Sequence, residues 1–193
     1  MELKDAIYGR RSIRKFKDIP IAEEDIREIV EAGTMAPSGT NIQPWYYVAI
    51  AHPETLEELR KIAAKGAEGA TPMLAERFKD HPEVVKPTTS FIATFGNAPL
   101  VVLVFLRPQN VESGRDTMIQ GIGAGIQNML LTAYEKGIGS CWMTALISGG
   151  VGEEIRLRFA PDKGELVATV AFGYSEQDPK MPKRKDDRSE FIL

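Results

Sequence analysis

The chain has 193 residues and a formal net charge of −3; 43% of its residues are hydrophobic and 26% are charged. A chain of this length can bury enough surface to form a core without metal or disulfide staples, so we expect a single domain over residues 1–193. The slight acidic excess provides no general attraction to nucleic acid or to an anionic membrane.

The cysteine count and the apolar runs indicate a cytoplasmic protein. The single cysteine, Cys141, excludes an intrachain disulfide and a cysteine-rich metal site, and it suits a reducing compartment. The N-terminus carries Glu2 and Asp5 where a signal peptide requires an apolar core. The apolar run Leu100–Leu106 is too short to cross a bilayer, so we expect no membrane partner.

A basic segment follows a short predicted helix at residues 2–9. This segment, Arg10-Arg11-Ser12-Ile13-Arg14-Lys15-Phe16-Lys17, has five cations in eight residues. In an extended conformation, Arg10, Ser12 and Arg14 would fall on one side and Ile13 on the other. Two guanidinium groups that flank a hydroxyl suit phosphate oxygens. The alternative interpretation is a solvated basic patch.

A polar loop is predicted after a second helix at residues 20–35. The run Ala36-Pro37-Ser38-Gly39-Thr40-Asn41-Ile42-Gln43-Pro44-Trp45 contains two prolines, one glycine and four hydroxyl or amide side chains. Proline fixes φ and removes a donor, whereas glycine permits unusual backbone conformations. We therefore expect an irregular loop that presents polar groups before a strand at Trp45–Ala51. An ordinary connection between helix and strand is the alternative.

The helical pattern of residues 54–65 weakens over residues 66–94, where glycines and prolines recur. One short helix around Met73–Phe78 is expected there, within an irregular excursion from the core. Such a segment can line a substrate entrance. His81, beside Pro82, is expected to be an exposed histidine without a catalytic role.

The second half of the chain begins with a strand predicted to be buried on both faces, Leu100–Leu106. A long helix is expected over Asp116–Lys136, although each of its interior glycines costs about 1 kcal/mol relative to alanine. A second backbone that crosses the helix closely would explain why these glycines are accepted. Their spacing does not match the dinucleotide fingerprint.

The remaining pattern predicts a short strand at Cys141–Thr144, a helix at residues 151–159 and a strand at Leu166–Tyr174. The end of the chain is basic from Lys180 to Arg188 and then apolar at Phe191-Ile192-Leu193, which favours a docked tail. The sequence contains no Ser-His-Asp set, no metal-spaced histidines and no paired catalytic carboxylates, so we expect no metal site and no catalytic side chain. Cys141 is interpreted as a packing residue.

Taken together and in this order, several of these motifs resemble those of the FMN-dependent nitroreductase family. They are the basic segment, the proline–serine–glycine loop with its Gln-Pro-Trp ending, Gly137-Ile138-Gly139-Ser140-Cys141-Trp142, Ala171-Phe172-Gly173-Tyr174 and the basic pair before the tail. The resemblance implies an α+β fold, a three-layer α/β/α sandwich with a mixed sheet. It also implies an intertwined homodimer with FMN at the subunit interface.

The same resemblance implies which residues bind FMN. The basic segment and the tail would hold the phosphate and ribityl chain, the loop would reach the partner subunit's cofactor, and the end of the short strand would face the ring. These residues are Arg10, Arg11, Ser12 and Arg14; Lys183 and Lys185, or Arg184 beside them; Pro37, Ser38, Gly39, Asn41 and Gln43; and Met143, Thr144 and Ala145.

The implied activity is electron transfer from NAD(P)H to nitroaromatic or quinone-like acceptors by a ping-pong mechanism, with the flavin carrying the chemistry. Two distant basic clusters in an acidic protein agree with this implication, because one phosphate would explain both. Two departures from the family pattern are Thr144-Ala145, where many relatives have a glycine pair, and Asp186-Asp187, where proline is more usual.

Two alternative functions follow from other interpretations of these residues. The first is a specialised flavin enzyme of the same fold, a reductive dehalogenase or a flavin-fragmenting enzyme. The second is a non-enzymatic phosphate or nucleic-acid binding module; the net charge and the lack of aromatic residues among the cations argue against it.

Overall fold

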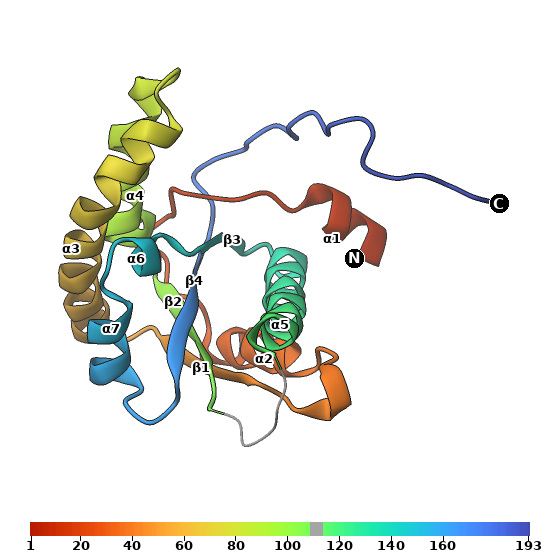
Figure 1. The fold of residues 1–193 in the computed structure, drawn as a ribbon, viewed down its shortest axis with the longest axis horizontal. Helices are drawn as coiled ribbons and strands as arrows, with labels where there is room; N and C mark the ends of the chain where they lie inside the picture. Colours follow the sequence, from red (N-terminus) through yellow and green to blue (C-terminus); the bar gives the residue numbers. More distant parts are fainter. Residues whose placement is uncertain (109–113) are drawn as a thin grey trace.

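A computed structural model describes residues 1–108 and 114–193. Its described residues contain one four-stranded sheet in the order β1-β2-β4-β3 (Figure 1). All three neighbouring strand pairs are antiparallel. The isolated bridge between Ser12 and Ser140 is parallel. The strands are β1 (Trp45–Ile50), β2 (Leu100–Leu106), β3 (Gly139–Met143) and β4 (Glu165–Gly173).

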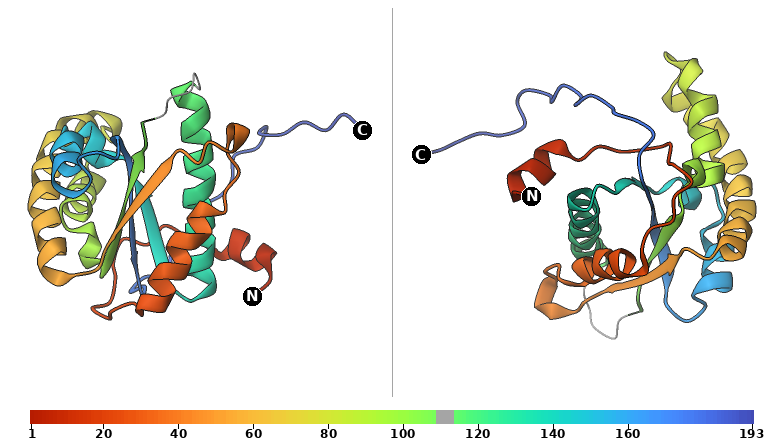
Figure 2. Two further views of the ribbon diagram at one scale, coloured as in Figure 1. Left: turned by 90° about the horizontal axis from the view of Figure 1, so that it is seen from below. Right: turned by 180° about the vertical axis from the view of Figure 1, so that it is seen from behind.

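Helices cover both faces of this sheet, which confirms the expected three-layer arrangement (Figure 2). One face carries α3 (Pro53–Arg77), α4 (Val85–Thr94), α6 (Ala145–Ser148) and α7 (Gly152–Phe159). The other face carries α2 (Glu23–Thr34) and α5 (Arg115–Glu135). The short helix α1 (Leu3–Gly9) lies beside the C-terminal end of α5. Three short 3₁₀ turns complete the described elements: η1 (Gly39–Asn41), η2 (Pro82–Val84) and η3 (Phe95–Asn97).

The strand β2 forms the centre of the core, as its apolar sequence predicts. It is paired on both edges, and all seven of its residues are buried. Because side chains alternate along a strand, Val101, Leu103 and Phe105 pack toward the α3 layer. The intervening Leu100, Val102, Val104 and Leu106 pack toward α5.

The prediction of an irregular excursion over residues 66–94 is wrong, because α3 continues unbroken to Arg77 and α4 follows it. The glycines that suggested a break allow close packing instead. A Cβ at Gly66 would lie 2.7 Å from Val151 Cγ2, and one at Gly69 would collide with the carbonyl oxygen of Gly149. Packing of the buried face, with Ala67, Ala70 and Leu74, therefore outweighs the low helix propensity of glycine.

The expectation that another backbone crosses α5 closely at its glycines is confirmed at Gly125, where that backbone belongs to α2 of the same chain. A Cβ at Gly121 would lie 3.4 Å from the carbonyl oxygen of Pro37. One at Gly125 would lie 2.7 Å from the carbonyl oxygen of Gly33 and would collide with the Tyr47 hydroxyl. That hydroxyl donates to Gly33 at 3.3 Å, and burial raises the pKa of Tyr47.

The C-terminal tail is exposed beyond residue 178 and extends past α1, away from the sheet (Figure 1). Its apolar end, Phe191 to Leu193, is at least 78% exposed. The prediction of a docked tail is therefore wrong for contacts within one chain. Among the described helices, none combines the length and the apolar character that a membrane span requires.

Candidate functional site

The basic segment is held in an extended path between β3 and the residues that follow β4. The amide of Ile13 donates to the Ser140 carbonyl at 2.9 Å, and the amide of Arg14 donates to Gln177 Oε1 at 2.8 Å. Ile13 and Phe16 are buried in the core. The backbone bonds and these two apolar anchors leave the side chain of Arg14 exposed.

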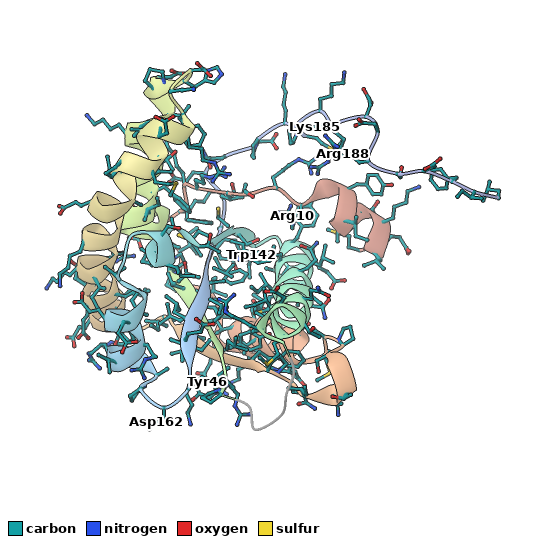
Figure 3. The ribbon with its side chains drawn as sticks, viewed as in Figure 1. Arg10, Tyr46, Trp142, Asp162, Lys185 and Arg188 are labelled. Carbon is teal, nitrogen blue, oxygen red and sulfur yellow. The ribbon has the colours of Figure 1, made fainter. Side chains whose placement is uncertain are left out.

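This segment and the tail enclose a hollow of about 680 Å³, open to solvent, which we call the tail hollow. It brings together residues that are far apart in the sequence, as predicted for one anion shared by two basic clusters. Figure 3 shows Arg10 on the segment that faces the tail bearing Lys185 and Arg188. The lining residues are Arg10, Arg11, Ser12, Arg14, Pro179, Lys180, Pro182 and Arg184.

A second hollow, of about 540 Å³, lies beside the first, and we call it the helix-end hollow. It lies between the start of the basic segment, the C-terminal end of α5 and the start of β3. Arg10, Arg11 and Pro179 line both hollows. Tyr134 and Ser140 line the helix-end hollow alone. The two hollows therefore form one continuous candidate site around Arg10 and Arg11.

The charges in this site are not neutralised by the described part of the chain. Within residues 1–108 and 114–193, none of the five cations that line the tail hollow forms an ion pair. Burial lowers the pKa of Arg10, and the positive charges of Arg11 and Arg184 lower it further. An anion between these groups would relieve their mutual repulsion.

Buried polar atoms without partners give independent support for a ligand here. Ser140 is 1% exposed, and its Oγ has no hydrogen-bond partner among the described residues. Arg11 Nε is also buried and has no partner among these residues. The Arg11 Nη1 atom donates to the carbonyls of Tyr8 at 2.7 Å and Arg10 at 2.8 Å. Buried polar groups in proteins are nearly always paired, so a ligand with polar oxygens fits this site.

The strand β3 leads from this site to Met143, Thr144 and Ala145. Its five residues span roughly 15 Å at the usual rise of a strand. Met143 is buried, whereas Thr144 is exposed at the turn into α6. Cys141, between them and the arginines, is 4% exposed. Burial raises the pKa of the Cys141 thiol, although Arg14 and Arg10 partly oppose this shift, which agrees with a packing role.

The loop over residues 37–43 is irregular, as predicted, and is closed by its own polar groups. The amide of Gln43 donates to Ser38 Oγ at 3.0 Å, and Gln43 Nε2 donates to Asn41 Oδ1 at 3.1 Å. Thr40, Asn41 and Gln43 have positive φ angles, a conformation that asparagine tolerates better than most residues. The loop packs on α5, near Gly121.

One chain does not bring this loop to the arginines. The loop lies at the N-terminal end of α5 near Gly121, whereas the helix-end hollow lies at its C-terminal end beside Tyr134. Gly121 and Tyr134 are thirteen positions apart along α5, a distance of roughly 20 Å. Figure 2 shows the loop and α1 at opposite ends of α5.

The tail residues of the site differ in part from the predicted ones. Lys183 and Lys185 do not line the tail hollow; with Arg184 they line a separate shallow hollow farther along the tail. Arg184, the predicted alternative to these two lysines, lines the tail hollow together with Lys180. Ser140 lies in the Gly137–Trp142 motif but is not among the predicted binding residues, because a serine within a strand does not by itself indicate a ligand. Lys180 belongs to the recognised basic tail but not to its predicted binding residues.

Comparisons with known proteins show the family and the fold. A model of the Nitroreductase family matches residues 7–174. A Bacillus subtilis (strain 168) protein, provisionally named NAD(P)H nitroreductase YfhC, is 28% identical over 190 residues, which are 98% of this chain and 92% of that protein.

Solved structures share the fold along the whole chain. A BluB-like flavoprotein from Clostridium difficile 630 matches with a TM-score of 0.76 and 30% identity over 100% of both chains. A provisionally named nitroreductase from Desulfovibrio desulfuricans, in complex with FMN, matches with a TM-score of 0.74 and 25% identity over 100% of this chain and 99% of that one. With a family model that covers most of its length and a fold shared from end to end with these structures, this chain belongs to the nitroreductase family.

Proposed function

We propose that the protein is an FMN-dependent oxidoreductase that uses NAD(P)H to reduce nitroaromatic or quinone-like acceptors. The observation that carries this proposal is the cluster of cations around the tail hollow, which lacks counter-ions among the described residues. Family membership and the FMN complex of a 25% identical structure support the identity of the anion.

The residues around the two hollows fit a flavin mononucleotide. Arg10, Arg11, Ser12 and Arg14 would hold its phosphate and ribityl chain, because guanidinium groups match phosphate oxygens in bidentate fashion. Lys180 and Arg184 would join them from the tail. Lys183 and Lys185 remain predicted contacts that require the tail to fold back. The backbone from Met143 to Ala145 would face the ring.

When bound, FMN would take electrons from NAD(P)H and pass them to the acceptor. The protein would contribute binding, orientation and positive charge. We expect ping-pong kinetics, because donor and acceptor would use the same pocket in turn.

We also propose a homodimer of single-domain subunits with each site completed by the partner subunit. If α5 pairs with its counterpart around a two-fold axis in antiparallel fashion, each N-terminal end lies near the other C-terminal end. The loop with Pro37, Ser38, Gly39, Asn41 and Gln43 would then approach the partner's basic segment. The separation of these groups along one α5 supports this arrangement.

A specialised flavin enzyme is the second candidate function. The likeness to a BluB-like flavoprotein at 30% identity and the pair Thr144-Ala145 at the end of β3 favour it. Such an enzyme would still bind FMN but would turn over nitro and quinone acceptors poorly.

Steady-state oxidation of NADH and NADPH, measured against nitro, quinone and halogenated acceptors, separates these candidates. We expect a yellow protein that oxidises at least one nicotinamide with nitro or quinone acceptors and gives parallel double-reciprocal plots. Turnover confined to halogenated acceptors would favour the second candidate. A colourless protein that does not bind added FMN would contradict both.

A further inference from the structure

The turn between α4 and β2 has an unusual backbone conformation. Phe95, Gly96 and Asn97 have consecutive φ angles of 54°, 62° and 60°. Residues other than glycine rarely enter this left-handed region and do so at a cost in free energy. Phe95 is fully buried in the core, and the Gly96 amide donates to Thr94 Oγ1 at 3.2 Å. The turn is therefore held by core packing and by the hydroxyl at the end of α4.

This turn contacts the basic segment at Arg14. A Cβ at Gly96 would collide with the carbonyl oxygen of Arg14 and would lie 2.9 Å from its carbonyl carbon. Two residues farther along, the amide of Phe16 donates to the Gly96 carbonyl at 3.3 Å. The Arg14 amide is fixed from the other side by Gln177 Oε1 at 2.8 Å. The backbone of Arg14 thus lies between Gln177 and Gly96.

The side chain of Arg14 is free to move, so the contacts that hold its backbone determine where the side chain can reach. Its side chain is exposed, and none of the described hydrogen bonds or ion pairs involves its guanidinium group. The position from which the side chain reaches the tail hollow therefore depends on where its Cα is held. A rigid backbone reduces the entropy that is lost when a guanidinium group binds an anion.

We propose that Gly96 is a positioning residue that sets the reach of Arg14 toward the bound phosphate, an inference that rests on the proposed function. Glycine is required for two reasons: the left-handed φ angle and the contact with the Arg14 carbonyl. Any side chain at position 96 would push residues 14–16 away from the turn. Thr94 assists because its hydroxyl holds the Gly96 amide.

The test is a double-mutant cycle on FMN affinity, measured by flavin fluorescence quenching. We expect Gly96→Ala to weaken FMN binding about tenfold, and Arg14→Ala about 10- to 150-fold, as for losing a charged hydrogen bond. In the Arg14→Ala background, Gly96→Ala should change the affinity less than about twofold, because coupled residues are not additive. Gly150→Ala is the matched control: Gly150 also has a positive φ, 80°, but no atom lies within 4 Å of its Cβ position.

The cycle distinguishes failure of this inference from failure of the proposed function. If Arg14→Ala leaves FMN affinity unchanged, the proposed site is wrong. Suppose instead that Arg14→Ala weakens binding. The positioning role is then wrong if Gly96→Ala has no effect on FMN affinity, if its effect adds to that of Arg14→Ala, or if its effect equals that of Gly150→Ala. If Gly96→Ala does not fold, Thr94→Val replaces it in the same cycle; we expect a severalfold loss that disappears in the Arg14→Ala background, and an additive loss would contradict the proposal.

Discussion

Replacement of Arg14 by alanine is expected to weaken FMN binding by roughly 1.5–3 kcal/mol, the range for loss of a charged hydrogen-bond partner. This corresponds to about a 10- to 150-fold rise in Kd. Binding should weaken because Arg14 lines the tail hollow, where the other cations also lack counter-ions among the described residues. A titration of the FMN-free protein with FMN at fixed ionic strength measures the change.

The matched control for Arg14 is Arg27→Ala. Arg27 is an exposed arginine on α2 that pairs with Glu23 and does not line either hollow. Its removal lowers the net positive charge by the same amount but should leave FMN affinity within about twofold, since screened surface charges act weakly over distance. Equal losses for both variants would mean that general charge, rather than the site, governs binding.

Replacement of Gly149 by alanine is expected to destabilise the fold by about 1–3 kcal/mol, as for overpacking of a close contact. A Cβ at Gly149 would collide with the Gly66 carbonyl oxygen and lie 2.7 Å from its carbonyl carbon. Both are backbone atoms of α3, which cannot move aside as a side chain can. Thermal unfolding should show a fall in Tm of about 2–4 °C for each kcal/mol.

Gly152→Ala provides the control for that experiment. Gly152 is the first residue of α7, and no atom lies within 4 Å of its Cβ position. Alanine in a helix is favoured over glycine by up to about 1 kcal/mol, so Gly152→Ala should be neutral or stabilising. An unchanged Tm for Gly149→Ala would contradict the close packing of α3 against the residues after α6.

The elements that could be predicted from the sequence are those whose pattern is determined locally. The apolar run Leu100–Leu106 predicts β2, and the acids after Pro20 predict α2, because strand burial and helix ends leave direct compositional signals. The basic segment could be recognised in the same way. Its hydroxyl and guanidinium groups do line one hollow.

The elements that could not be predicted depend on partners distant in the sequence. Gly66 and Gly69 suggest a break, but their helix continues because Leu146, Gly149 and Val151 pack against it. Gly125 of α5 has the same explanation, because the carbonyl of Gly33 on α2 lies where its side chain would be. Arg184 is a predicted alternative, but the sequence does not indicate that Lys180 would line the tail hollow in preference to Lys183 and Lys185, since the path of an exposed tail is not encoded in local propensity.

The central claim is that each site is assembled from two subunits, and a heterodimer tests it most directly. One subunit carries Arg14→Ala, and the other carries Ser38→Ala with Asn41→Ala in the loop; two different tags isolate the mixed dimer. Both variant homodimers should bind FMN weakly at every site. In the mixed dimer, one site would combine a native basic segment with a native partner loop. We predict FMN binding at native affinity with half the native stoichiometry; two weakened sites per mixed dimer, neither at native affinity, would contradict an assembled site.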